Sequence, residues 1–449
     1  MAFAESRARR AISRASTVAI VVILLVVAIG SVYYISTTGP SPSSSTTASS
    51  SSASSTTSTS STLSSYSGPP TIKIGMTMPL SGSLATDGVL SLDGLKLWAQ
   101  NVNASGGIYV KSLNHRLPVQ LIYYDDTSTA SVVATDYQQL VTQGVNFLVA
   151  PYSSGLTLAA APIAETNHIL LMSHGGASDS IWSHGYHYVV GVLSPGSQYM
   201  IPVLQMLQNR NSSAPLKVAL FFGNDAFSIS VRQGALAYIN STSGKFSVVY
   251  NQLYDEPGTS HTAELTQIQS YNPDVILGGA HFADGETIMK NIQSLGLHFN
   301  MVSLLVAPDD PHFPSDLGAL ANSVVAPSQW EPNLDFSHFT PYYGNISSSQ
   351  FFSQFQSTFG ITPNYEAAEA YNTGLVLQKA ITDSGSLNST TVRSQMSGEN
   401  FWTFYGNFQI GPTGIQAGHT MVVMQWQTGV KQTIWPKAVA TSPFVYPAP

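Results

Sequence analysis

The sequence predicts an α/β protein of two lobes with parallel sheets, preceded by one transmembrane helix and a disordered Ser/Thr-rich linker. Short apolar runs alternate with longer helical patterns from residue 71 onward, and this alternation is typical of parallel sheets covered by helices. The 449 residues exceed what one compact core usually holds, which favours two lobes. An apolar run followed by a Ser/Thr-rich stretch near the N-terminus predicts the helix and the linker.

Residues 18–35 are almost continuously apolar, close to the ~20 residues with which a helix crosses a bilayer. Four arginines precede them, so we expect residues 1–17 to form a basic cytoplasmic tail and the remaining chain to lie on the extracellular side. A cleaved secretory signal usually has a shorter apolar core, which favours a retained single-pass anchor. Arg14-Ala15 is also similar to an archaeal pilin-type processing site, and cleavage there would leave the anchor in place.

Residues 36–70 are rich in Ser and Thr and can bury no core, so we expect a disordered stalk. The chain has no cysteine, which excludes disulfides and a lipid-modified cysteine anchor. It carries 24 acidic and 17 basic residues, and this acidic balance argues against nucleic acid as a partner. Five N-x-S/T sequons suit an exported glycoprotein: Asn103, Asn211, Asn240, Asn345 and Asn388.

The body begins with a predicted strand and continues with strands separated by helical patterns. Between the first two strands, Leu92, Leu95, Ala99 and Val102 recur at helical spacing and lay an apolar stripe on one helix face. In open sheets of this kind, ligands bind at the carboxyl ends of the strands. The predicted strands cover 71–78, 117–124, 146–150, 168–173, 186–191, 217–222, 246–253, 274–279 and 301–307.

Two serines, Ser153 and Ser154, stand where a predicted strand ends and a helix begins. Backbone amides without helical partners and the positive end of the helix dipole meet there, so the hydroxyl groups either cap the helix or help to bind an anion. A nucleophilic serine is the third interpretation. The sequence PYSSG does not match the G-x-S-x-G elbow that this chemistry favours, so we expect no enzyme activity.

A second polar turn, "SHGGASDS", follows the next predicted strand. Gly175 and Gly176 permit close backbone approach by a ligand, while Ala177 and Ser178 offer amides and one hydroxyl group. An ordinary glycine turn is the alternative. Because the two strands are expected to be neighbours, both turns are predicted to form walls of one site.

The first lobe resembles the type I solute-binding proteins of branched-chain amino acid ABC importers, the Leu/Ile/Val-binding class. The resemblance rests on "IKIGMTMPLSGSLATDGVLSLDGLKLWAQNVNASGGI", on "FLVAPYSSGLTLAAAPIAE" and on "ILLMSHGGAS", and it returns at "GNFQIGPTGIQAGHTMVVMQWQTG". It implies two Rossmann-like lobes joined by three crossing strands. Lobe 1 would then comprise residues 71–193 and 326–420, and lobe 2 residues 194–325 with a return and C-terminal tail over 421–449.

The resemblance also implies a ligand site. In lobe 1, Ser154, with Ser153 beside it, matches the family serine that grips the ligand carboxylate, and Gly176, Ala177 and Ser178 match a turn that supplies amides. In lobe 2, Phe227 matches the family's aromatic residue, and His281 and Phe282 fall where the family often has aromatics. The acid that grips the ligand ammonium is not plain. Three further residues are candidates for lining the cleft: Asp309, Asp87 and Trp330.

The resemblance implies an extracellular binding protein that captures a small polar solute, most often an amino acid, and presents it to an ABC permease. A membrane-tethered sensor with the same fold, and a receptor for amides, urea or short carboxylates, are the alternatives. An exported hydrolase using Ser153 or Ser154 is a further rival. We expect no cofactor and no metal.

Overall fold

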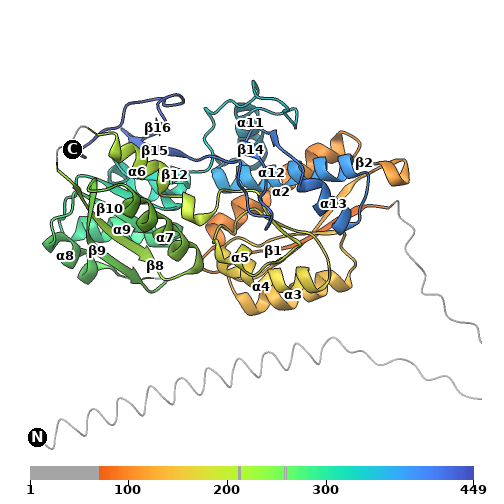
Figure 1. Cartoon of the computed structure of the whole chain (residues 1–449), viewed down its shortest axis with the longest axis horizontal. Coiled ribbons are helices and arrows are strands. Elements are labelled where there is room, and N and C mark those ends of the chain that lie inside the picture. The colour runs from red at the N-terminus through yellow and green to blue at the C-terminus, as the bar shows by residue number, and fades with distance from the viewer. Residues whose placement is uncertain (1–69, 211–213, 257, 259) are drawn as a thin grey trace, which may run out of the picture. The chain divides into compact units, whose positions relative to one another are not determined.

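The computed structural model describes residues 70–210, 214–256, 258 and 260–449. The predicted basic tail, the anchor over 18–35, nearly all of the stalk and the Asn211 sequon lie outside the described residues. Within those ranges, no helix is long and apolar enough to cross a membrane. Figure 1 shows the chain with its elements labelled.

Lobe 1 is built on a five-stranded parallel sheet in the order β4-β1-β5-β6-β7. In β1 the side chains of Ile72, Ile74 and Met76 are fully buried against one helical layer, while Gly75 faces Val145 and Leu140 of the other. This sheet is therefore covered on both faces, as the alternating pattern predicted. Its strands are β1 (Ile72–Met78), β4 (Val119–Asp125), β5 (Phe147–Val149), β6 (Leu171–Ser173) and β7 (Val189–Gly191).

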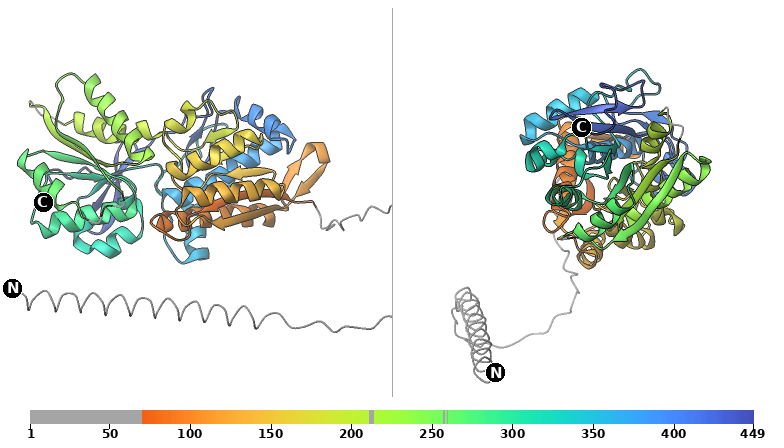
Figure 2. Two further views of the ribbon diagram at one scale, coloured as in Figure 1. Left: turned by 90° about the horizontal axis from the view of Figure 1, so that it is seen from below. Right: turned by 90° about the vertical axis from the view of Figure 1, so that its left-hand side faces the viewer.

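Two groups of helices cover the sheet of lobe 1, as Figure 2 shows. The first group shares a core with β1 and comprises α2 (Ala85–Ala104), α11 (Ser348–Phe359), α12 (Tyr365–Ser384) and α13 (Ser389–Met396). The second comprises α3 (Ala130–Thr142), α4 (Ser154–Thr166) and α5 (Ser180–Ser183). Small additions are β2 (Ile108–Val110), η1 (Lys111–Leu113), β3 (His115–Leu117), β13 (Phe401–Trp402) and β14 (Asn407–Phe408).

Lobe 2 contains a seven-stranded sheet in the order β16-β15-β12-β11-β10-β8-β9. Its helices are α6 (Ile201–Gln208), α7 (Ala226–Ser241), α8 (Thr262–Ser270), α9 (Phe282–Ser294) and α10 (His312–Leu317), with η2 (Gly196–Gln198), η3 (Ala307–Asp309) and η4 (Gly318–Ala321). Its strands are β8 (Leu216–Gly223), β9 (Phe246–Tyr254), β10 (Val275–Gly279), β11 (Val302–Leu304), β12 (Val325–Ser328), β15 (Val422–Gln427) and β16 (Val430–Trp435).

The predicted parallel sheets are confirmed except at one edge of lobe 2, where two strands run antiparallel. Strand β15, which the chain enters after returning from lobe 1, runs antiparallel to β12, and β16 runs antiparallel to β15. Thr428 and Gly429 join these two strands at φ of 49° and 78°. Positive φ at both positions is what a two-residue type I′ turn requires.

Three segments connect the lobes, and one polar residue from each meets the others. Gln329 accepts from the Ser194 amide through Oε1 (3.1 Å) and donates to the Ser194 carbonyl through Nε2 (3.2 Å). The Ser194 hydroxyl lies 2.8 Å from Nδ1 of His419. All three side chains are buried, and all three lie outside the regular strands. The hinge is therefore a buried hydrogen-bonded junction of irregular segments.

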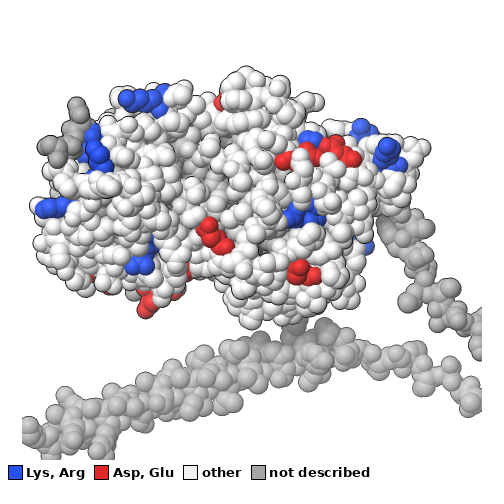
Figure 3. All heavy atoms as spheres, in the orientation of Figure 1, with Lys and Arg blue, Asp and Glu red and all other residues white. Residues whose placement is uncertain are grey.

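Charged residues make up only 9% of the chain, and the face drawn in Figure 3 shows them as scattered spots among uncharged atoms. No large field of one sign covers this face. This face therefore attracts charged partners only weakly at long range, and local contacts decide which partner binds.

Candidate functional site

The first wall of the site is the turn between β5 and α4. The Ser154 hydroxyl oxygen accepts hydrogen bonds from the amides of Ala177 (3.1 Å) and Ser178 (3.0 Å), so the two polar turns of lobe 1 are joined. Ser153 is 6% exposed and adopts φ of 151°, which residues other than glycine rarely do. The two turns thus form one wall, as their adjacent strands predicted, and Ser154 holds them together.

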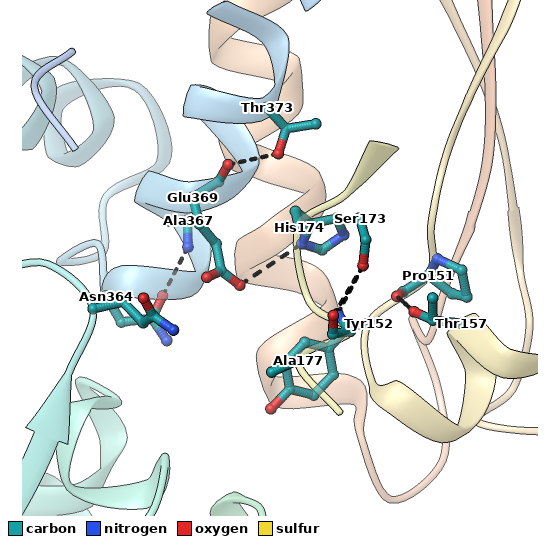
Figure 4. A network of polar contacts seen from close by, with 12 residues as sticks. Pro151, Tyr152, Thr157, Ser173, His174, Ala177, Asn364, Ala367, Glu369 and Thr373 are labelled. Atoms are coloured by element: carbon teal, nitrogen blue, oxygen red, sulfur yellow. Dashed lines mark hydrogen bonds and ion pairs between the residues drawn. The ribbon is translucent and has the colours of Figure 1, made fainter. Parts of the chain in front are cut away.

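The glycines after β6 make room for protein side chains. A Cβ atom on Gly175 would lie 2.9 Å from the Tyr152 ring, and one on Gly176 would lie 2.5 Å from the Thr157 hydroxyl. Thr157 in turn donates to the Pro151 carbonyl at 3.2 Å. Figure 4 shows this packing between the β5 and β6 turns. The close approach that the glycines permit is therefore between two turns of lobe 1.

The opposite wall belongs to lobe 2. The Asp225 side chain caps α7 by accepting from the Phe227 amide at 2.7 Å, and the buried Phe227 ring lies 4.9 Å from that of Tyr199. His281 is 7% exposed, and its Nδ1 lies 3.1 Å from the hydroxyl of Tyr152 in lobe 1. The two lobes therefore touch across the site.

A cavity of about 340 Å³ lies between these walls. Carboxyl ends of strands from both sheets surround it, which is where ligands of open α/β sheets bind. Side-chain atoms of the kind that can bind a metal ion also lie within 4.8 Å of one another in Asp225, Glu256 and His281. The lining residues are Ser83, Leu84, Ser128, Ala130, Ser153, Gly155, Leu156, Asn224, Asp225, Glu256, His281, Ala283 and Asp284.

Asp179 makes a second cross-lobe contact. It follows the β6 turn of lobe 1 and accepts from the Ser197 amide at 2.9 Å and the Ser197 hydroxyl at 2.8 Å. It also accepts from the hydroxyl of Ser230 on α7, and its own amide donates back to that hydroxyl at 3.1 Å. This group of three residues, here called the interlobe clasp, holds the lobes together through charge-assisted hydrogen bonds.

Deeper in the protein, buried carboxyl groups and tyrosines gather. Glu366 and Glu369 lie in the first two turns of α12, and Asp87 lies in the first turn of α2. With Tyr152 and Tyr365 they form what we call the acid chamber. The three carboxyl groups act electrostatically on one another; both glutamates also act on the two tyrosines, and Asp87 acts on Tyr152. Burial raises the pKa of Glu366 and Asp87 well above the usual range, with neighbouring carboxyl groups adding to the effect.

Of the three acids, Glu369 has the most polar partners. Its carboxyl group accepts from the Tyr405 hydroxyl at 3.0 Å and lies 4.0 Å from Nδ1 of His174. Figure 4 shows the Glu369 side chain pointing toward His174, with the Tyr152 ring beside them. Burial lowers the pKa of His174 to about 3, so this imidazole is neutral and contributes no charge at pH 7.

Three residues that were predicted to line the cleft contact other parts of the protein. Asp309 pairs with Lys431 at 2.8 Å, and its other oxygen accepts from the Tyr365 amide at 2.8 Å. Trp330 lies in the core of lobe 1 against Phe351, and Phe282 packs on the core of α8 and α9. Of the predicted acids, Asp87 is the one that keeps a carboxyl oxygen without a hydrogen-bond partner.

Sequence reasoning missed Tyr152, Tyr199, His174, Glu366 and Glu369. A signal for the last two was present, since "YEAAEAY" places two acids three residues apart on a helix that is otherwise apolar. Residues at this spacing share one helix face. In a helix that packs on both sides, that face has no solvent to meet, so paired acids there indicate a buried polar site.

Comparison with known proteins agrees with the two-lobed α/β fold. The sequence model of the family described as "Periplasmic binding protein" matches residues 71–431. Leu/Ile/Val-binding protein homolog 7 of Brucella melitensis biotype 1 is 20% identical over 387 residues, covering 83% of this chain and 93% of the relative.

Two solved structures share the fold. The branched-chain amino acid transporter substrate-binding protein LivJ of Streptococcus pneumoniae, in complex with isoleucine, has a TM-score of 0.68 at 21% identity, over 82% of this chain and 100% of that chain. An ABC-transporter solute-binding protein of R. palustris, in complex with benzoate, has a TM-score of 0.69 at 17% identity, over 84% and 98% of the two chains.

Proposed function

The chain belongs to the periplasmic binding protein family, and on that premise we propose that it captures a small solute between its two lobes and presents it to an ABC transporter. The proposal names a binding protein and no reaction. Curated relatives and solved neighbours are binding proteins, which supports this assignment.

One observation carries the proposal: the site is built from both lobes. Ser153 of lobe 1 and Asp225 of lobe 2 line one cavity, and Tyr152 contacts His281 across it. A solute held there adds contacts to both walls and so favours the closed arrangement over an open one. Closure is the signal by which a transporter could distinguish a loaded receptor from an empty one.

We propose an amino acid as the solute class. The neighbouring structures hold isoleucine and benzoate, and both molecules carry a carboxylate. In this chain the amides of Ala177 and Ser178 meet the Ser154 hydroxyl beside the cavity wall, an arrangement of donors that suits a carboxylate after a small rearrangement. The carboxyl groups of the acid chamber suit the ammonium group of an amino acid.

The place of action is a further part of the proposal. Residues 18–35 would anchor the protein as a single span, and the Ser/Thr-rich stalk would hold the binding body on the extracellular side. Membrane fractionation tests this: the full chain should sediment with membranes and be digested by external protease. Recovery of the intact protein in the soluble fraction would contradict the anchor.

A thermal-shift panel tests the function itself, using amino acids, diamines, amides, short carboxylates and sugars. A true ligand at 100 times its Kd should stabilise the protein by about 2.7 kcal/mol. A shift that appears with one chemical class and disappears on Ser153→Trp, which fills the cavity, supports the proposal. A Ser183→Trp variant, altered at an exposed position of α5, is the matched control. No shift with any class would contradict it.

A further inference from the structure

Two carboxyl groups of the acid chamber are buried with oxygen atoms that lack a hydrogen-bond partner. Glu366 is fully buried, and neither of its carboxyl oxygens has a hydrogen-bond partner. Asp87 is 1% exposed; the Tyr152 hydroxyl donates a hydrogen bond to its carboxyl group, and its Oδ1 has no partner. An ionised carboxyl group that is buried without a cation is strongly disfavoured, because nothing replaces its lost hydration. Such groups point to a partner that arrives from outside.

The neighbouring cations of the described chain are engaged elsewhere. Lys431 bonds to Asp309 at 2.8 Å and Glu331 at 3.1 Å, and His312 bonds to Asp310 at 2.8 Å. Those three acids thus have partners of their own. His312 also acts electrostatically on Asp87, but neither Asp87 nor Glu366 forms an ion pair within the described residues.

The tyrosine rings complete the chamber. Tyr152, Tyr199 and Tyr365 are all nearly fully buried; burial raises the pKa of each, and Glu366 adds to the effect. Aromatic faces attract cations, and carboxyl oxygens attract N–H donors. A group that satisfies both is a protonated amine or an amidinium, whereas a quaternary ammonium has no N–H to donate.

We propose that the solute is an organic cation, with more positive than negative charge, whose protonated amine or amidinium group donates hydrogen bonds to Asp87 and Glu366. This inference rests on the proposed binding function and replaces its solute class with organic cations: basic amino acids, diamines and guanidines. The acids come from α2 and α12 of lobe 1, so this lobe holds the cationic group before lobe 2 closes.

Titration calorimetry of the whole protein with arginine, lysine, putrescine, leucine and benzoate tests the inference. At least one of the first three should bind 30-fold or more tightly than leucine, and Glu366→Gln should weaken that binding by about 30-fold or more. Asp316→Asn, which removes an exposed carboxylate, should leave it unchanged.

A second readout separates binding from folding. Glu366→Gln removes an unpartnered buried acid, so the ligand-free variant should melt at a higher temperature while binding more weakly. Preferential binding of leucine or benzoate, or unchanged binding of the cation by the variant, would overturn the inference and leave the binding function standing. If none of the five solutes bound, and no other solute shifted the melting temperature, both proposals would be contradicted.

Discussion

Removing Asp179 should open the protein. This side chain accepts hydrogen bonds from the amide and the hydroxyl of Ser197 and from the hydroxyl of Ser230, and it is the lobe 1 member of the interlobe clasp. In Asp179→Ala all three donors lose their acceptor. When the lobes separate, these donors meet water, so the substitution removes stabilisation from the closed form and little from the open one.

The magnitude follows from the contacts. Hydrogen bonds to a charged acceptor contribute about 1.5–3 kcal/mol each when buried. Asp179 is half-buried, so we take about 1 kcal/mol for each of the three, or about 2–3 kcal/mol for the clasp. At about 1.4 kcal/mol per tenfold, the population ratio of closed to open forms should fall by about 30- to 150-fold.

Small-angle scattering measures this directly. Ligand-free Asp179→Ala should have a larger radius of gyration than the parent protein, and the solute that stabilises the parent most should bind more weakly by a similar factor. Asp316→Ala, which removes an exposed acid hydrogen-bonded to the neighbouring Ser315, should match the parent. A parent-like scattering curve together with parent-like affinity in Asp179→Ala would refute the reasoning.

Three further substitutions test other parts of the structure. Ser154→Ala leaves two buried amides without an acceptor and should cost about 1–3 kcal/mol in urea unfolding, whereas the exposed Ser183→Ala should cost almost nothing. Lys431→Met leaves two buried acids without their cation and should cost about 3–5 kcal/mol; a parent-like melting temperature would show that the ion pair contributes little. Burial lowers the pKa of His419 to about 4, below its unfolded value, so the contribution of this residue to stability should be full above about pH 6.5 and fall by about 2 kcal/mol between pH 7 and 5. In His419→Gln that fall should shrink, and an equal fall in the variant would assign it to other groups.

The architecture of lobe 1 could be predicted because its signals are local. Each apolar run of "IKIGMTM" type becomes a buried strand, and alternation with helices dictates a parallel sheet. The antiparallel edge of lobe 2 could not be predicted in the same way. Strands β15 and β16 enter that sheet from the third interlobe crossing, and nothing near residues 422–435 records the direction of a strand that lies about 100 residues earlier.

The site was predictable only where neighbouring strands build it. Ser154 and the turn at Ala177 follow adjacent parallel strands, and their contact follows from that adjacency. Asp309 shows the opposite case, because its cation comes from Lys431 on the last strand. Glu366 lies far from both turns in the sequence, and acids on a helix usually face water. Only the packing of α12 against α2 turns this position into part of a buried chamber.

Hydrogen–deuterium exchange, on the protein mixed with the solute that stabilises it most, tests the central claim most directly. Capture between two lobes predicts slower exchange on both walls at once, over residues 152–156 and 176–179 in lobe 1 and over residues 225–228 and 281–284 in lobe 2. The 70–80 segment at the centre of lobe 1 should exchange equally slowly with and without solute. Protection confined to one lobe, or to a surface remote from these four segments, would contradict the account.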